Sequence, residues 1–199
     1  TLCISNCNTL FASSGRSPFM FLHSLVTRNS LDCAHFAALP PSLKKLRLST
    51  DFSRRNTEGG QLGHLPRGLT TLEMRCKVEP RLSDIELLPP YLTKLDMMLT
   101  ISWTDETIKA LPRTLQFLYL SSGSLTHRCV EYLPPAIQYV KLSATFTSDL
   151  FKIRAFPPWL SYLRVWQIQM LPNCTTDTTK LIKSLPFSLE VSQIVPVKT

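Results

Sequence analysis

The chain has 199 residues, of which 44% are hydrophobic and 18% are charged. This length can hold one extended domain or two small ones with a sizeable core and excludes a small disulfide-held protein, and the composition excludes a disordered chain. The net charge of +8 at pH 7 would suit phosphates or an acidic protein surface, but the basic residues are spread along the chain. The longest apolar runs, such as Phe19–Leu22, are too short to cross a bilayer, so we expect no membrane contact.

Residues 1–16 precede the first copy of a repeat, and we expect them to form an amino-terminal cap or a truncated unit. The chain begins at Thr1 rather than Met and shows no signal-peptide pattern, so we expect a longer cytoplasmic protein with an upstream segment. The six cysteines have no paired CxxC spacing, which favours buried free thiols in a reducing compartment.

A ten-residue phrase recurs along the rest of the chain, and its second half follows the pattern LxxLxL. It reads LPPSLKKLRL from Leu39, LPRGLTTLEM from Leu65, LPPYLTKLDM from Leu88, LPRTLQFLYL from Leu111, LPPAIQYVKL from Leu133 and FPPWLSYLRV from Phe156. A degenerate copy begins near residue 17, where Phe21 and Val26 occupy apolar places and Ser24 replaces an apolar residue. Another copy, LPFSLEV, begins at Leu185. We therefore expect one repeat domain over residues 17–199.

Each repeat is predicted to contain one short strand and one short helix. The last apolar residues of the phrase alternate with polar ones, as in a half-buried strand. The residue three places before each phrase is apolar, as expected for one helical turn that ends at the following proline: Phe36, Leu62, Ile85, Ile108, Val130, Ile153 and Ile182. Ser83 and Glu86 have the spacing of a capping box. The sequence thus predicts an α/β solenoid with a concave parallel sheet and short convex helices.

The Leu-Pro-x-x-Leu-x-x-Leu-x-Leu phrase resembles the leucine-rich repeats of FNIP-repeat proteins and of many protist and fungal F-box-associated arrays. It is also similar, less closely, to the LPX repeats of bacterial effector ubiquitin ligases. Phe52 and Phe146 match the Phe of the FNIP signature, whereas Ser53 and Thr147 stand in place of its Asn. The resemblance covers residues 17–191 and implies a leucine-rich-repeat solenoid that recognises substrates within a ubiquitin ligase adaptor.

The residues between the strand leucines are predicted to form the concave surface in three columns. The first column is Lys45, Thr71, Lys94, Phe117, Tyr139 and Tyr162. The second column is Arg47, Glu73, Asp96, Tyr119, Lys141 and Arg164. The third column is Ser49, Arg75, Met98, Ser121, Ser143 and Trp166. Neighbours within a column would lie about 4.8 Å apart.

These columns predict an aromatic patch that binds a protein partner through residues Phe117, Tyr119, Tyr139, Tyr162, Arg164 and Trp166. The structural alternative is that the rings only cover the sheet or pack beneath the carboxyl-terminal tail. At the other end of the face, basic and acidic residues alternate, and we expect them to neutralise one another in solvent.

Catalysis is not expected, because the chain has no hydrolase, metalloprotease, P-loop or dinucleotide motif. Cys33 with His35 and His127 with Cys129 lie on corresponding helices four repeats apart, about 19 Å, which is too far for a shared metal ion. We therefore predict a monomeric, non-catalytic protein-binding module without a metal or cofactor. The alternative is a nucleic-acid-binding solenoid that uses basic and aromatic surface residues, and its affinity would depend strongly on salt.

Overall fold

The computed structural model describes residues 2–4, 21–27, 36–48, 61–74, 82–97, 103–121, 125–126, 128–147, 156–170 and 188–196. Nine strands form one sheet, in chain order and all parallel. They are β1 (Leu2–Ile4), β2 (Ser24–Thr27), β3 (Lys45–Leu48), β4 (Thr71–Met74), β5 (Lys94–Met97), β6 (Phe117–Ser121), β7 (Tyr139–Thr147), β8 (Tyr162–Met170) and β9 (Ser188–Pro196).

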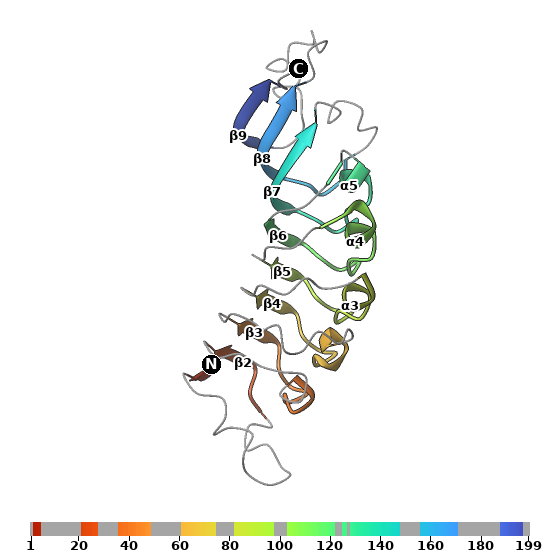
Figure 1. The fold of residues 1–199 in the computed structure, drawn as a ribbon. Helices are drawn as coiled ribbons and strands as arrows, with labels where there is room; N and C mark the ends of the chain where they lie inside the picture. The colour runs from red at the N-terminus through yellow and green to blue at the C-terminus, as the bar shows by residue number, and fades with distance from the viewer. Residues whose placement is uncertain are drawn as a thin grey trace.

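Short helices lie on the opposite side of the stack from the strands (Figure 1). They are the 3-10 helix η1 (Gln61–His64) and the α-helices α3 (Leu82–Glu86), α4 (Asp105–Lys109) and α5 (Arg128–Glu131). Figure 1 shows a shallow arc with the sheet along its inner side and the helices along its outer side. The predicted α/β solenoid with a concave parallel sheet is confirmed. Within the described ranges, no helix has the length and apolar character needed to cross a membrane.

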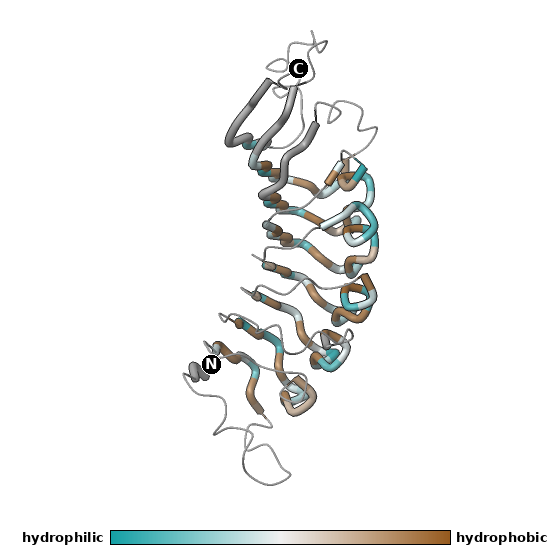
Figure 2. The backbone as a smooth tube through the Cα atoms, in the orientation of Figure 1, coloured by the Kyte–Doolittle hydropathy of each residue, from teal (hydrophilic) through white to brown (hydrophobic). Residues whose placement is uncertain are grey.

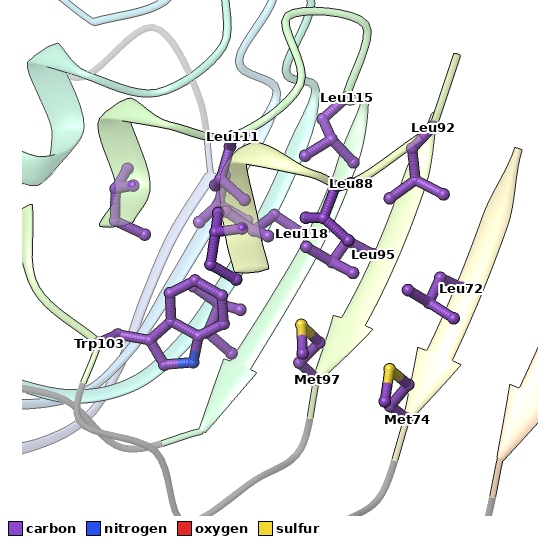
Figure 3. Close-up of a cluster of buried hydrophobic side chains, with 14 of the residues drawn as sticks. Leu72, Met74, Leu88, Leu92, Leu95, Met97, Trp103, Leu111, Leu115 and Leu118 are labelled. Carbon is purple, nitrogen blue, oxygen red and sulfur yellow. The ribbon is translucent and has the colours of Figure 1, made fainter. Parts of the chain in front are cut away.

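The inward leucine positions of the phrase are consecutive partners across the sheet. Leu46 pairs with Leu72, and the same row continues through Leu95, Leu118, Val140 and Leu163. All six side chains are buried. Figure 3 shows how the leucines of neighbouring units pack together between the strands and the helices. A unit buries its apolar residues against its neighbours, which explains why one unit is too small to fold alone.

The proline of the phrase begins a tight turn that brings the chain back to the sheet. The amide of Leu43 donates to the carbonyl of Pro40 at 3.0 Å, and the next five phrases repeat this bond, with Ile137 in place of leucine in one of them. The helix before the turn ends in the same way, since the amide of Leu39 donates to the carbonyl of Phe36 at 3.2 Å. In Figure 2 apolar residues recur at the same places in successive units.

The predicted apolar helix positions are buried wherever the structure describes them. These are Phe36, Leu62, Ile85, Ile108 and Val130. The two remaining positions, Ile153 and Ile182, lie outside the described residues.

Main-chain hydrogen bonds connect each unit to the next just before the strand. The carbonyl of Lys44 accepts from the amides of both Thr70 and Thr71, and the carbonyl of Thr70 accepts from the amides of Thr93 and Lys94. The same double acceptance recurs at each joint from His23 to Gln138. Because each such carbonyl uses both lone pairs, the joints between units are fully hydrogen-bonded at this point.

The two degenerate copies have a different register from the one predicted. Leu25 pairs with Leu46, and Leu25 is 2% exposed, whereas Phe21 is 84% exposed. The first copy is therefore offset by one residue, because strand pairing turns Leu25 and the buried Thr27 inward instead of Ser24 and Val26. In the last copy, Leu189 pairs with Leu163, so Leu189 occupies a strand position rather than a turn position.

The chain ends also join the sheet. Within residues 1–16, β1 pairs with β2 in the register of the other strands, as a repeat unit would. At the other end, residues 191–196 continue β9 alongside β8. The structure differs at one helix start too: α3 begins at Leu82, so Ser83 lies inside the helix and not at its cap. A capping box is present instead at α4, where Thr104 and Thr107 exchange hydrogen bonds.

Candidate binding surface on the sheet

Three neighbouring strands place aromatic rings at the same register position. Phe117 on β6 pairs with Tyr139 on β7, which pairs with Tyr162 on β8. Each of the three precedes a buried aliphatic residue of its strand. Since side chains alternate between the two faces of a sheet, the three rings lie on the face turned away from the core. We call Phe117, Tyr139 and Tyr162 the aromatic row.

The rings of the row contact one another. Tyr139 and Tyr162 are stacked, with ring centroids 4.1 Å apart and an interplanar angle of 11°. Phe117 lies 6.5 Å from Tyr139, and Tyr119 lies 5.3 Å from it, both tilted by 32°. Such pairs contribute about 0.5 to 1.5 kcal/mol beyond the area they bury. The four rings therefore form one continuous aromatic surface that spans three strands.

The six predicted patch residues do not all contact one another. Phe117 is 37% exposed and Trp166 is 51% exposed. Trp166 lies four residues beyond Tyr162 on the same strand, and it makes no ring contact with another described residue. An irregular register in β7 between Leu142 and Thr145 interrupts the third column next to Trp166. Ser49, Arg75 and Met98 of that column lie outside the described residues.

Glu190 on β9 belongs to this surface, although the sequence analysis did not identify it. The hydroxyl of Tyr162 donates to Oε2 of Glu190 at 2.5 Å, and Nε of Arg164 lies 3.7 Å from the same oxygen. Glu190 extends the second column by one strand because it pairs with Arg164 in register. The predicted register of the last copy placed Leu189 in the turn and not in the strand, so the strand position of Glu190 was not recognised.

Charged residues occupy the amino-terminal half of the same face. Glu73 lies 2.6 Å from Nζ of Lys94 and 3.4 Å from Nε of Arg47. The Lys94 ammonium also lies 5.8 Å from the centre of the Tyr119 ring. The predicted neutralisation of opposite charges is confirmed for Arg47 and Glu73, whereas Arg75 lies outside the described residues.

The environment of the patch raises the pKa of two of its phenols. Burial, followed by the neighbouring Tyr139, raises the pKa of Tyr119. Burial, followed by the hydrogen bond to Glu190, raises the pKa of Tyr162. Both effects disfavour the charged phenolate, either by removing water or by placing it beside a carboxylate.

Alkaline titration is expected to distinguish the phenols of Tyr119 and Tyr162 from those of an unfolded chain. An unfolded tyrosine ionises near pH 10, so a raised folded-state pKa gives stability that is complete below about pH 10 and declines as the pH rises above it. We expect Tyr119 and Tyr162 to ionise late when tyrosinate absorbance is followed, and Glu190→Gln to make one of these late steps begin at lower pH, because the carboxylate beside Tyr162 is removed. If the variant and the parent had superimposable titrations, the Glu190 contact would not form in solution.

Of the four candidate metal residues, the structure describes Cys129. No group of three or more His, Cys, Asp or Glu side chains that could hold a metal ion occurs in the described part of the chain. Cys129 is a buried free thiol, and burial, followed by the charge of Asp105, raises its pKa. Cys33, His35 and His127 lie outside the described residues.

Asp105 has a role that its position at a helix start did not reveal. Its carboxylate accepts hydrogen bonds from the amide of Thr126 at 3.0 Å and from its hydroxyl at 2.6 Å. Thr126 lies in the next unit, so Asp105 connects two units on the helical side of the stack. The Asp105 carboxylate therefore has a structural role, because it connects consecutive units.

No protein-family model matches this sequence, and no curated protein matches it either. The functional assignment therefore rests on the fold and on the geometry of the aromatic surface.

Proposed function

We propose that this chain is a non-catalytic protein-binding module and that its concave sheet binds the partner through the aromatic row. The observation that supports this proposal is the contact between rings from three adjacent strands, at 4.1 and 6.5 Å along the row. Aromatic anchors of this kind carry a large share of the binding energy in protein interfaces. The rigid sheet beneath them holds the rings in place before the partner arrives, which lowers the entropic cost of binding.

The same geometry favours a protein over a nucleic acid. Tyr139 and Tyr162 stack on each other, so one face of each ring is already occupied and is not available to a base. Two of the three cations beside the rings are engaged by carboxylates, since Lys94 pairs with Glu73 and Arg164 pairs with Glu190. A strand of phosphates needs a track of free cations. By resemblance of the repeat phrase to leucine-rich repeats, we propose that the bound protein is a substrate of a ubiquitin ligase adaptor.

Site-specific photo-crosslinking tests the location of the surface. A photoreactive phenylalanine analogue placed at Phe117 or at Trp166 is expected to crosslink a discrete protein in an extract of the source organism. The same analogue at Tyr91, which is 66% exposed in the turn before β5, serves as the control. The readout is the set of crosslinked species separated by mass and identified by mass spectrometry. Identical species from all three positions would contradict a binding surface centred on the aromatic row.

A further inference from the structure

We propose that the partner presents an acidic side chain next to an apolar one, and that Lys141 binds the acidic group. This inference rests on the proposed function and names the chemistry of the segment that the aromatic row would bind. Lys141 lies on β7 between Tyr119 on β6 and Arg164 on β8, which are its register partners. Tyr139 precedes it by two residues on the same face.

Lys141 differs from the neighbouring cations in having no anionic partner among the described residues. Lys94 pairs with Glu73, and Arg164 pairs with Glu190. The Lys141 side chain is half-buried and makes no ion pair or hydrogen bond with any part of the chain that the structure describes. A cation held beside rings and beside a second cation is less well hydrated than a free one, so an incoming anion is bound more strongly there than at an exposed lysine.

The arrangement of charges around the patch favours a single carboxylate rather than a chain of phosphates. On the described face of β6 to β9, Lys141 and Arg164 stand against the one carboxylate of Glu190, which leaves one uncompensated positive charge. On the strands that precede Tyr119, Arg47 and Lys94 are already paired with Glu73 and do not continue a track of free cations for an extended polyanion. One acidic group above Lys141, with an apolar side chain over the aromatic row, satisfies both features of the surface.

A displayed library of random peptides provides the probe. Peptides selected on the parent chain are expected to carry Asp or Glu close to an aromatic or large aliphatic residue. Their affinity should fall about tenfold with Lys141→Met, which keeps the aliphatic stem, because one charge-assisted hydrogen bond is lost. Lys141→Glu should weaken them further. Arg113→Glu alters the charge equally in the exposed turn before β6 and should leave binding unchanged. Circular dichroism melts of all variants verify that the fold is retained.

The outcomes separate this inference from the proposed function. Selected peptides that need Tyr139 and Tyr162 but contain no acidic residue, or that bind Lys141→Met as tightly as the parent, would overturn the inference alone. Acidic peptides that bind equally well after both tyrosines are replaced would overturn the proposed function. A library that enriches nothing on the parent counts against both. A fluorescent oligothymidylate is the probe for phosphate. If it bound the parent chain in a salt-sensitive way and did not bind Lys141→Met, Lys141 would bind phosphate and not a carboxylate, and the inference would be overturned.

Discussion

Replacing Leu118 by alanine is expected to lower the free energy of unfolding by about 2 to 5 kcal/mol, the range for a fully buried leucine whose site cannot collapse. Leu118 is 0% exposed and pairs with Leu95 on one side and Val140 on the other. Its side chain therefore belongs to the apolar contacts of three units, and in a solenoid each unit depends on its neighbours for stability. Figure 3 shows Leu118 among the leucines of the preceding unit. Urea unfolding followed by circular dichroism measures the effect.

Leu82→Ala is the matched control for this substitution. Leu82 is 42% exposed at the start of α3, so the same deletion removes little buried area there. We expect a cost below about 1 kcal/mol, in line with most surface substitutions. If the Leu118 variant were no less stable than the Leu82 variant, the inward row of leucines would not hold the stack together.

Replacing both Tyr139 and Tyr162 by alanine is expected to weaken partner binding by at least about a hundredfold, since two anchor residues each contribute about 2 kcal/mol or more and their effects are not additive. Both rings lie on the concave face of the sheet, turned away from the core, next to buried Val140 and Leu163 that remain in place. The fold should survive, with a cost of about 0.5 to 1.5 kcal/mol for the lost ring pair. The affinity is measured by titrating the partner that crosslinking identifies against the immobilised parent and variants.

The control for the tyrosine pair removes two other exposed rings. Phe21 and Tyr91 are 84% and 66% exposed and lie outside the aromatic row. Phe21→Ala with Tyr91→Ala should leave partner binding within about twofold of the parent, as expected for residues outside the energetic centre of an interface. Equal retention of the partner by the two double variants would mean that the aromatic row serves only to cover the sheet.

The central part of the fold could be predicted because the turn, helix and strand patterns of the repeat all indicate the same structure there. The proline fixes the turn, the apolar residue three places earlier fixes the helix, and the alternating leucines fix the strand. Once the leucines point inward, the columns on the other face follow from geometry alone. This is why the neighbouring positions of Phe117, Tyr139 and Tyr162 were correctly predicted from spacing.

The ends of the sheet could not be predicted with the same accuracy, since their inward positions are not all apolar. Thr27 is 0% exposed in a place that leucine, methionine or valine fills in β3 to β8, and Phe21 is exposed, so the apolar pattern favoured the wrong register by one residue. The last copy lacks the full phrase before Leu189, so the start of its strand and the position of Glu190 in it could not be predicted. The lengths of β7, β8 and β9 are set by their pairing with one another, which no local pattern records.

The main-chain joints between units have a consequence for how such a chain can change over generations. Each joint, such as the one where the carbonyl of Lys44 accepts from the amides of Thr70 and Thr71, is built on main-chain hydrogen bonds. At some joints a hydroxyl adds a bond to the same carbonyl, as that of Thr70 does at 3.0 Å. A copy can therefore follow another after gene duplication or recombination when its inward residues fit the interior and its amides reach the carbonyl of the preceding copy. The breadth of the inner face can grow or shrink by whole copies, while its outward residues diversify independently toward new ligands.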